Sequence, residues 1–355
     1  MTSLDQAKAV RQGESLDAEK IAAYLKEKLP RLDGPATVRQ FHSGFSNLTY
    51  LISMGETELV LRRPPFGKKA KTAHDMSREY RILRALKPVF PHVPEPMAYC
   101  DDPAVMDAPF YVMERMRGVI LRKELPDAPA LGSPAAGRLC RRWVDVLGDL
   151  HRLDYQGCGL ADLGNPDGYV SRQVHGWSKR YRDARTDDVP DFETVMAWLN
   201  AGMPPDCSAP ALVHNDYKFD NVILDPADLT RIIGVLDWEM ATIGDPLMDL
   251  GASLGYWIEA DDSDELKLIR TLPTLCPGML TRRQIVALYE KKTGATIENF
   301  AWYYCFGLFR LAVIAQQIYY RFFHGQTADK RFGMLGFAVG ILEKAAVRVI
   351  ETGEY

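Results

Sequence analysis

Three oxygen-bearing side chains, Asp216, Asn221 and Asp237, lie within a short stretch of the sequence and could act together at one site. Carboxylate and amide oxygens suit Mg²⁺, which takes few protein ligands and completes its coordination shell with water and phosphates. A separate carboxylate beside the metal could accept a proton from an attacking hydroxyl group. These residue types therefore indicate metal-assisted chemistry on a phosphate, with a hydroxyl as the attacking group.

The segments around these side chains predict a β-hairpin that would position them. Two short apolar runs, residues 222–224 and 232–236, are separated by residues that favour turns. Antiparallel pairing of these runs would place Asn221 roughly opposite Asp237 at one end of the hairpin. Asp216 precedes Asn221 by five residues, in a loop that could fold back over the same place.

The spacing matches a template for phosphoryl transfer, H-x-D-x-x-x-x-N followed by a metal-binding Asp. Its four positions are occupied by His214, Asp216, Asn221 and Asp237. The alternative is that these acids only serve turns and strand ends, where acidic residues are common. The octet alone is a weak motif, and the hairpin register of Asp237 makes it more specific.

This stretch resembles the catalytic region of the aminoglycoside phosphotransferase and choline kinase group of small-molecule kinases. Residues 243–250 match the G-D-P-x-x-D-L pattern of one branch, whose members include kinase-like domains fused to acyl-CoA dehydrogenases. The resemblance spans nearly the whole chain. It implies an α+β, bilobal protein-kinase-like fold with ATP and Mg²⁺ as cofactors.

The resemblance also implies a role for each residue of the motif. Asp216 would be the catalytic residue that orients or deprotonates the acceptor hydroxyl, and His214 would brace its loop. Asn221 and Asp237 would hold Mg²⁺. Asp249 would accept hydrogen bonds from N–H groups of the catalytic loop, which is a holding role.

Composition limits the class of protein. A chain of 355 residues is long enough for two lobes, and a net charge of −4 with a pI near 6.0 gives no reason to expect a nucleic-acid partner. Six scattered cysteines without a C-x-x-C pair favour a reducing cytoplasm over a disulfide framework or zinc site. The N-terminus has no apolar core like that of a signal peptide, and charged residues interrupt the apolar stretches, so we expect a cytoplasmic protein without a membrane partner.

The periodicity divides the chain into a β-rich part and a helical part. Residues 1–114 are predicted to form an N-terminal nucleotide-binding lobe, with a helix capped by Asp75 and a five-stranded antiparallel sheet. The predicted strands are residues 38–42, 48–54, 58–62, 95–100 and 109–114. Residues 115–355 are predicted to form a mostly helical C-terminal lobe that carries the catalytic hairpin and binds the substrate.

Two parts of the N-terminal lobe would bind ATP phosphates. The loop between the first two strands, with Ser43, Gly44 and Ser46, is where a kinase-like fold covers the phosphates, although a plain hairpin turn is the alternative. Arg62 stands where relatives often carry a lysine, and its planar guanidinium could serve the same phosphates. Arg63 is the alternative on the opposite face of the strand.

Two further predictions follow from position in the lobe. Glu79, on the helix after the third strand, is the candidate partner of Arg62, as in the Lys–Glu pair of kinases. The backbone of Glu114 and Met116, in the connector after the fifth strand, would hydrogen-bond the adenine.

The acceptor is predicted from charge. Residues 171–185 carry five basic residues against one acid, and residues 300–323 contain no acid. A solvated helix face is the default interpretation of the first segment, and a basic wall for an anionic substrate is the alternative. Both segments argue against aminoglycosides and choline, which are cations, and favour an anionic or lipophilic acceptor. The resemblance implies a hydroxyacyl-CoA as one candidate.

The leading hypothesis is therefore an ATP- and Mg-dependent phosphotransferase with a small-molecule hydroxyl as acceptor. One alternative is a nucleotide-binding pseudokinase with a regulatory role. The presence of Asp216, Asn221 and Asp237 argues against it, and Arg62 is the one irregularity. An unrelated enzyme that happens to contain the octet is a third possibility, which the order of the two lobes disfavours.

Overall fold

The computed structural model describes residues 5–42, 47–67, 75–123, 132–327 and 329–355. The chain divides into two compact units. The first unit comprises Met1–Ile120, Cys158–Leu160 and Val222–Glu239, and the second comprises Leu121–Gly157, Ala161–Asn221 and Met240–Tyr355. The lobe boundary expected after Glu114 stays a prediction, and the first unit includes the later hairpin segment as well.

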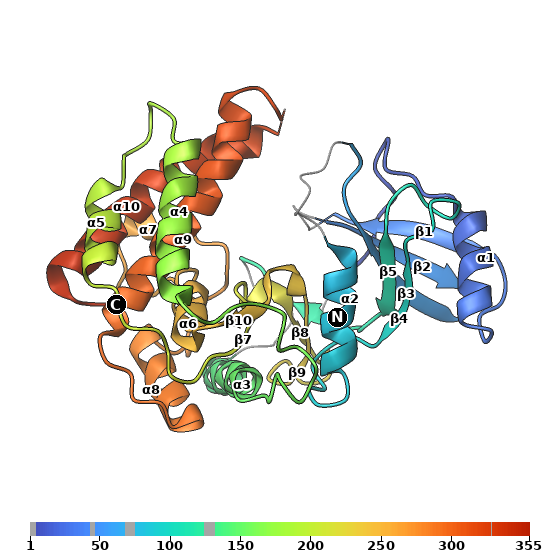
Figure 1. Cartoon of the computed structure of the whole chain (residues 1–355), viewed down its shortest axis with the longest axis horizontal. Helices are drawn as coiled ribbons and strands as arrows, with labels where there is room; N and C mark the ends of the chain where they lie inside the picture. The colour runs from blue at the N-terminus through green and yellow to red at the C-terminus, as the bar shows by residue number, and fades with distance from the viewer. Residues whose placement is uncertain (1–4, 43–46, 68–74, 124–131, 328) are drawn as a thin grey trace. The chain divides into compact units, whose positions relative to one another are not determined.

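An antiparallel sheet forms the centre of the first unit, with the strand order β1-β2-β3-β5-β4 (Figure 1). This confirms the five-stranded sheet and the α+β class predicted from the sequence. The bounds are β1 Ala36–Phe41, β2 Leu48–Met54, β3 Thr57–Arg63, β4 Pro96–Cys100 and β5 Phe110–Glu114.

Helices α1 (Ala18–Lys28) and α2 (Met76–Leu86) lie on opposite faces of this sheet (Figure 1). Side chains alternate between the faces of a strand, and in β3 the buried Leu59 and Leu61 join the apolar core that includes α1. Arg62 of the same strand is therefore on the face covered by α2. The cap predicted at the start of α2 is confirmed, because the Asp75 carboxylate accepts the N–H of Arg78.

The predicted hairpin is present in the first unit as β8 (Val222–Leu224) and β9 (Ile232–Val235). Its register differs slightly from the prediction, because Val222 pairs with Val235 and the register shifts between Ile223 and Leu224. Asp237 lies beyond the end of β9 with a left-handed φ of 69°. The irregular pairing and the left-handed residue are local backbone features that the alternation of apolar residues could not reveal.

Helices make up most of the second unit. Their bounds are α3 Ser133–His151, α4 Tyr169–Ala184, α5 Glu193–Ala201, α6 Pro246–Leu254, α7 Asp264–Leu268, α8 Arg282–Thr293, α9 Phe300–Phe323 and α10 Leu335–Thr352. Helix α9 is buried along most of its length and crosses α6 closely, because Gly307 on α9 meets the backbone of Gly251 on α6 without an intervening Cβ. No helix in the described part of the chain is both long and apolar enough to cross a bilayer.

Strand β7 (Ala211–Val213) pairs antiparallel with β10 (Thr242–Gly244) and leads into residues 214–221, which we call the catalytic loop after its predicted role. All three residues of β7 are buried. The loop ends in the 3₁₀ turn η1 (Phe219–Asn221), and a second 3₁₀ turn, η2 (Trp238–Met240), follows Asp237. The remaining short elements are β6 (Val119–Ile120), which pairs with β8, and the 3₁₀ turn η3 (Lys330–Met334).

Candidate active site

Asp249 anchors the start of the catalytic loop. Its Oδ2 accepts the backbone N–H of His214 at 2.7 Å, and its Oδ1 accepts the N–H of Asn215 at 2.8 Å. Asp249 is fully buried on α6, a helix that begins at the cap residue Asp245. The holding role predicted for Asp249 is thus confirmed in its geometry.

A buried histidine completes this anchor. Nε2 of His151, at the end of α3, lies 3.0 Å from Oδ2 of Asp249, and its Nδ1 lies 2.7 Å from the hydroxyl of Tyr289. Burial by itself raises the pKa of Asp249, but the hydrogen bond from His151 and the N–H of His214 bring that pKa below its ordinary value. The anchor is therefore an ionised carboxylate at neutral pH.

The carboxylate of Asp216 is held through both of its oxygens. The amide Nδ2 of Asn221 donates to Oδ2 at 2.8 Å and to the backbone carbonyl of Asp216 at 2.9 Å. The ammonium of Lys218 lies 3.0 Å from Oδ1. The Asp216 side chain remains 17% exposed, so it is fixed in direction and still open to a ligand.

His214 also contacts Asp216. It is fully buried, and its Nδ1 accepts the backbone N–H of Asp216 at 3.2 Å. The structure therefore brings together three of the predicted residues in the second unit, His214, Asp216 and Asn221. Their roles in catalysis remain predictions.

Lys218 is a member of this cluster that the sequence reasoning missed. Its ammonium stacks on the Tyr256 ring at 4.6 Å and lies 3.9 Å from a carboxylate oxygen of Asp220. Burial opposes the charge, yet Tyr256, Asp216 and Asp220 raise the pKa of Lys218 above its ordinary value. A lysine two residues after Asp216, inside the octet, was the available signal.

Arg62 links two predicted residues in the first unit. Its Nη1 donates to Oε1 of Glu79 at 2.5 Å, and its Nη2 donates to Oδ1 of Asp237 at 2.9 Å. Burial opposes the charge of Arg62, but Glu79 and Asp237 raise the pKa of the guanidinium well above its ordinary value. The contact predicted between Arg62 and Glu79 is present, and the phosphate-binding role of the pair remains a prediction.

Contacts on either side hold Asp237 in this position. The N–H of Val235 donates to the carbonyl of His92 at 2.6 Å, and the N–H of Trp238 donates to Oε1 of Glu79 at 3.3 Å. The indole of Trp238 is buried against the ring of Phe90, with their centroids 6.1 Å apart. Asp237 thus follows a strand end that is fixed by both backbone and side-chain contacts.

Glu239 and Asn47 are further members that the sequence reasoning missed. Oε2 of Glu239 accepts the amide of Asn47 at 2.7 Å and lies 3.9 Å from Nη2 of Arg62. The second acid of the tripeptide Asp-Trp-Glu at 237–239 was a possible signal. The alternative cation Arg63 pairs instead with Asp107 at 3.0 Å, on the other face of the sheet.

The remaining predictions for nucleotide binding concern two segments of the chain. Ser43, Gly44 and Ser46 lie outside the described residues. Glu114 ends β5, where its N–H donates to the carbonyl of Glu95 at 2.8 Å. Met116 follows in the connector, and its thioether packs against the backbone of Gly234, since a Cβ there would lie 2.7 Å from the sulfur.

The donor chemistry of the predicted metal ligands fits Mg²⁺. The Nδ2 of Asn221 is directed at Asp216, so its amide oxygen is the atom that could bind a cation. The side chain of Asp237 is 31% exposed and carries a hard carboxylate. Among the residues that the structure describes, no group of three or more His, Cys, Asp or Glu could hold a metal by itself. A cation bound by either residue would therefore depend on phosphate and water oxygens to complete its shell.

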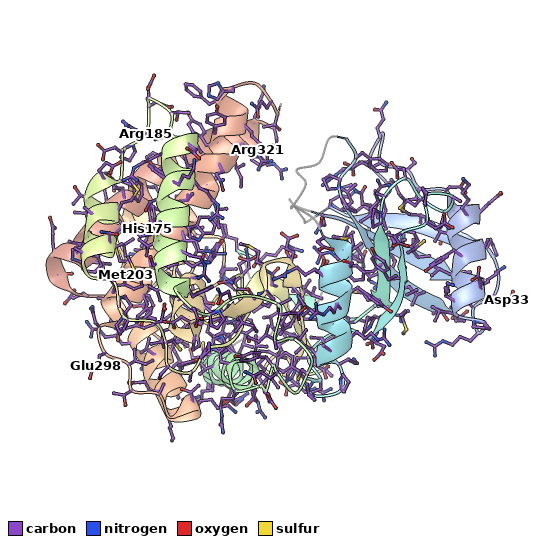
Figure 2. The ribbon with its side chains drawn as sticks, viewed as in Figure 1. Asp33, His175, Arg185, Met203, Glu298 and Arg321 are labelled. Carbon is purple, nitrogen blue, oxygen red and sulfur yellow. The ribbon has the colours of Figure 1, made fainter. Side chains whose placement is uncertain are left out.

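Most of the basic residues on α4 have local partners. Arg172 donates to the carbonyls of Asp167 and Asn165. Lys179 pairs with Asp183 at 2.6 Å. Arg182 pairs with Glu193, also at 2.6 Å. Arg185 follows the end of α4, and Arg321 lies near the end of α9 (Figure 2). These contacts fit a solvated helix face for the paired residues.

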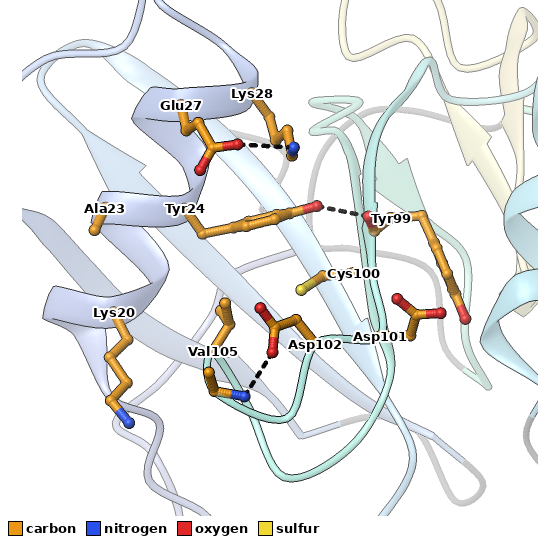
Figure 3. A pocket seen from close by; sticks show the side chains of 11 residues that line it. Lys20, Ala23, Tyr24, Glu27, Lys28, Tyr99, Cys100, Asp101, Asp102 and Val105 are labelled. Atoms are coloured by element: carbon orange, nitrogen blue, oxygen red, sulfur yellow. Dashed lines mark hydrogen bonds and ion pairs between the residues drawn. The ribbon is translucent and has the colours of Figure 1, made fainter.

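A pocket of about 490 Å³ lies in the first unit, between α1 and the end of β4 (Figure 3). Tyr24 crosses it and donates its hydroxyl to the carbonyl of Tyr99 at 2.5 Å. Of the described residues predicted for catalysis or nucleotide binding, none lines this pocket. The residues that line it are therefore distinct from the described residues of the site above.

Comparisons with known proteins agree with the motif. The model of the phosphotransferase enzyme family matches residues 37–272. The chain is 33% identical over 331 residues to acyl-CoA dehydrogenase family member 10 of Mus musculus, and 32% identical over 328 residues to acyl-CoA dehydrogenase family member 11 of Gallus gallus. Each alignment covers 90% of this chain but only 30% and 41% of the respective relative, so the chain spans less than half of their length.

Solved structures share the fold. A Ralstonia eutropha protein assigned as an aminoglycoside phosphotransferase has a TM-score of 0.80 at 28% identity, covering 95% of this chain and 99% of its own. A choline kinase from Cryptosporidium parvum has a TM-score of 0.62 at 13% identity, covering 95% and 97%. A spectinomycin phosphotransferase solved with ADP and spectinomycin has a TM-score of 0.59 at 10% identity, covering 94% and 98%. The last two show the fold alone, and together they confirm the predicted protein-kinase-like fold.

The family model covers most of the first unit and continues beyond the catalytic loop and Asp249. The chain therefore belongs to the phosphotransferase enzyme family.

Proposed function

We propose that this protein is an ATP- and Mg-dependent kinase that transfers the γ-phosphate of ATP to a hydroxyl group of a small molecule. The observation that carries the proposal is the fixed carboxylate of Asp216. Asn221 and Lys218 each hold one of its oxygens, at 2.8 and 3.0 Å, and the side chain remains partly exposed. A carboxylate held in one direction is suited to orient a hydroxyl and take its proton.

Asp216 would act on the acceptor side of the reaction. It would accept the hydroxyl proton while the acceptor oxygen forms its bond to the γ-phosphorus and the bond from that phosphorus to the leaving ADP oxygen breaks. The cation of Lys218, 3.0 Å from Asp216, would stabilise negative charge that develops beside the carboxylate. Positioning and charge stabilisation supply most of the acceleration in this type of reaction.

Arg62 would act on the nucleotide side. Its guanidinium presents several donors in a plane, which suits phosphate oxygens, and Glu79 fixes its direction. Asn221 and Asp237 are the ligands that we propose for Mg²⁺. When bound, the metal would neutralise charge on the phosphate oxygens. The backbone of Glu114 and Met116, together with Ser43, Gly44 and Ser46, remain the proposed contacts to the rest of ATP.

We propose an anionic or lipophilic acceptor in place of an aminoglycoside. Helix α9 contains no acidic residue, and a polycation would require carboxylates in its site. Relatives over 90% of this chain are named for acyl-CoA dehydrogenases, which supports a hydroxyacyl-CoA as the first candidate. Other relatives are named for viomycin and spectinomycin, so both substrate classes belong in a test.

A non-catalytic nucleotide-binding protein with a regulatory role is the second candidate. The replacement of the usual lysine by Arg62 is the feature that favours it. Arg62 nevertheless makes the carboxylate contact expected of that lysine, with Glu79 at 2.5 Å. This favours catalysis over a purely regulatory role.

The test is ADP release from Mg·ATP by the purified protein with hydroxylated acyl-CoAs, amino alcohols and aminoglycosides, followed by mass spectrometry of the acceptor. We expect a phosphorylated hydroxyacyl-CoA and no product without Mg²⁺. ATP binding without a phosphorylated acceptor in any class would instead support the regulatory candidate. The absence of both ATP binding and turnover would contradict both candidate functions.

A further inference from the structure

Asn215, the residue directly before Asp216, has an unusual backbone conformation. Its φ is 63°, in the left-handed region that L-residues with a side chain rarely adopt. Asparagine tolerates this region better than most residues, and glycine tolerates it best. The conformation turns the chain between the buried His214 and the partly exposed Asp216. Whatever holds Asn215 therefore sets the direction of Asp216.

Each polar group of Asn215 has its own partner. The backbone N–H donates to Asp249 at 2.8 Å, and the backbone carbonyl accepts from Nη2 of Arg310 at 2.5 Å. The side-chain Oδ1 accepts from the hydroxyl of Tyr169 at 3.3 Å, and Nδ2 donates to the carbonyl of Met240 at 3.1 Å. Four segments thus converge on one residue. We call Asn215 with Asp249, Arg310, Tyr169 and Met240 the Asn215 clamp.

Arg310 is the member of the clamp that its surroundings explain least. It lies on α9, among mainly apolar side chains, and is 3% exposed. No carboxylate of the described residues lies within 4.0 Å of its guanidinium, which packs on the ring of Trp177 at 5.1 Å and meets the sulfur of Met240 at 3.5 Å. A buried cation without a carboxylate is unfavourable for stability. Its short hydrogen bond to Asn215 indicates what it does instead.

We propose that Arg310 and Asn215 form a positioning pair that fixes the direction in which the Asp216 carboxylate meets the acceptor hydroxyl. Both act through the backbone of the catalytic loop and are positioning residues. The kinetic part of this inference rests on the proposed kinase function, whereas its structural part does not. Loss of the pair leaves the loop tied to Asp249 but free to change the direction of Asp216.

Arg310→Met keeps the length of the side chain and removes its donors and charge. We expect kcat to fall by about 10- to 100-fold, the effect of a misplacement of about 1 Å at a reacting group. KM for ATP stays unchanged, because Arg62 and Asp237 are not altered. Arg310→Lys, which retains a donor and the charge, restores part of the lost kcat.

Substitutions of Asn215 separate the backbone from the side chain. Asn215→Gly keeps the left-handed conformation but removes the contacts to Tyr169 and Met240, so we expect a smaller fall in kcat than for Arg310→Met. Asn215→Ala removes the same contacts and adds backbone strain, because alanine disfavours positive φ. We expect its kcat to be lower than that of Asn215→Gly.

The same variants are measured by amide hydrogen exchange of residues 214–221, which needs no substrate. Exchange in the loop becomes faster in Arg310→Met and Asn215→Gly. The matched control is Gln316→Met on the same helix. Gln316 is fully buried and donates to the carbonyl of Ala184 at 2.8 Å, away from the loop. Its loss lowers the melting temperature but changes neither kcat nor loop exchange.

A lower kcat together with faster loop exchange supports the positioning pair. Unchanged exchange in Arg310→Met overturns it, since a fall in kcat would then come from direct contact with the acceptor. Unchanged kcat with faster exchange also overturns it. If the parent protein phosphorylates no acceptor, the proposed function fails, and hydrogen exchange alone then decides the clamp. If Arg310→Met does not fold, Arg310→Lys and Asn215→Gly provide the same comparison.

Discussion

The guanidinium of Arg62 lies 2.9 Å from the carboxylate of Asp237, a residue 175 positions later in the sequence. The same guanidinium meets Glu79 on α2 at 2.5 Å. The buried cation of Arg62 therefore connects β3 with Glu79 on α2 and with Asp237, which follows β9. Since Arg62, Glu79 and Asp237 are all proposed to serve ATP or its metal, substitutions at Arg62 should affect nucleotide binding and stability together.

Arg62→Met is the first test. It leaves Glu79 buried without its cation, so we expect the free energy of unfolding to fall by about 3–5 kcal/mol, the usual cost of breaking a buried ion pair. ATP affinity should fall as well. Urea unfolding and calorimetric titration with ATP measure the two effects. Arg63→Met is the matched control, because Arg63 is buried but pairs with Asp107, and it should leave ATP affinity unchanged. Equal ATP affinity in Arg62→Met and the parent would place phosphate binding elsewhere.

Asp249→Asn tests the anchor of the catalytic loop. The carboxylate of Asp249 accepts two backbone N–H groups and a hydrogen bond from His151, whereas an amide has only one acceptor oxygen and no charge. We therefore expect the stability to fall by about 1–3 kcal/mol. Because the loop carries Asp216, kcat should also fall. Both effects are read from thermal unfolding and steady-state kinetics. A fully active and stable variant would show that the loop is held by other contacts.

The same variant predicts a pH dependence. The pKa of Asp249 in the folded chain lies below its ordinary value, so its stabilising contribution is fully present above the unfolded pKa of about 3.9. That contribution is lost as the pH falls from there through the lower, folded pKa. The stability difference between the parent and Asp249→Asn should therefore be constant near neutral pH and shrink below about pH 4. If this stability difference instead grew on acidification, the pKa of Asp249 would be raised on folding and not lowered.

Asp237→Asn and Asn221→Ala test the metal assignment. Each should raise the Mg²⁺ concentration needed for half-maximal activity by about tenfold or more, since even residues outside the coordination shell cost about 10- to 100-fold when they are lost. A magnesium titration at saturating ATP measures this. Asp225→Asn is the control, because Asp225 lies in the turn of the same hairpin and pairs with the exposed Arg231. An unchanged magnesium requirement in both variants would contradict the assignment of Asn221 and Asp237 as magnesium ligands.

Local patterns predicted much of the fold. Alternating apolar residues and turn formers were enough to predict the five strands of the sheet, and Asp75 caps α2 as expected. The contact between Arg62 and Glu79 followed from the order of elements in a kinase-like lobe. The hairpin register was less accurate, because the register shift inside it and the positive φ of Asp237 depend on packing and not on apolar periodicity.

Contacts between distant segments could not be predicted in this way. Asn47 and Glu239 are 192 residues apart, and Arg310 and Asn215 are 95 apart. An arginine in an apolar helix gives no sign of its partner, because any turn of the helix could face any neighbour. The fold alone brings these side chains to their hydrogen-bond partners.

The most direct test of the proposed kinase is Asp216→Asn, assayed for phosphorylation of the acceptor and for ATP binding. If Asp216 takes the hydroxyl proton, kcat falls by about 10²- to 10⁴-fold while the dissociation constant for ATP is unchanged. A variant that binds ATP normally and phosphorylates the acceptor as fast as the parent would contradict the assignment of Asp216 as the base.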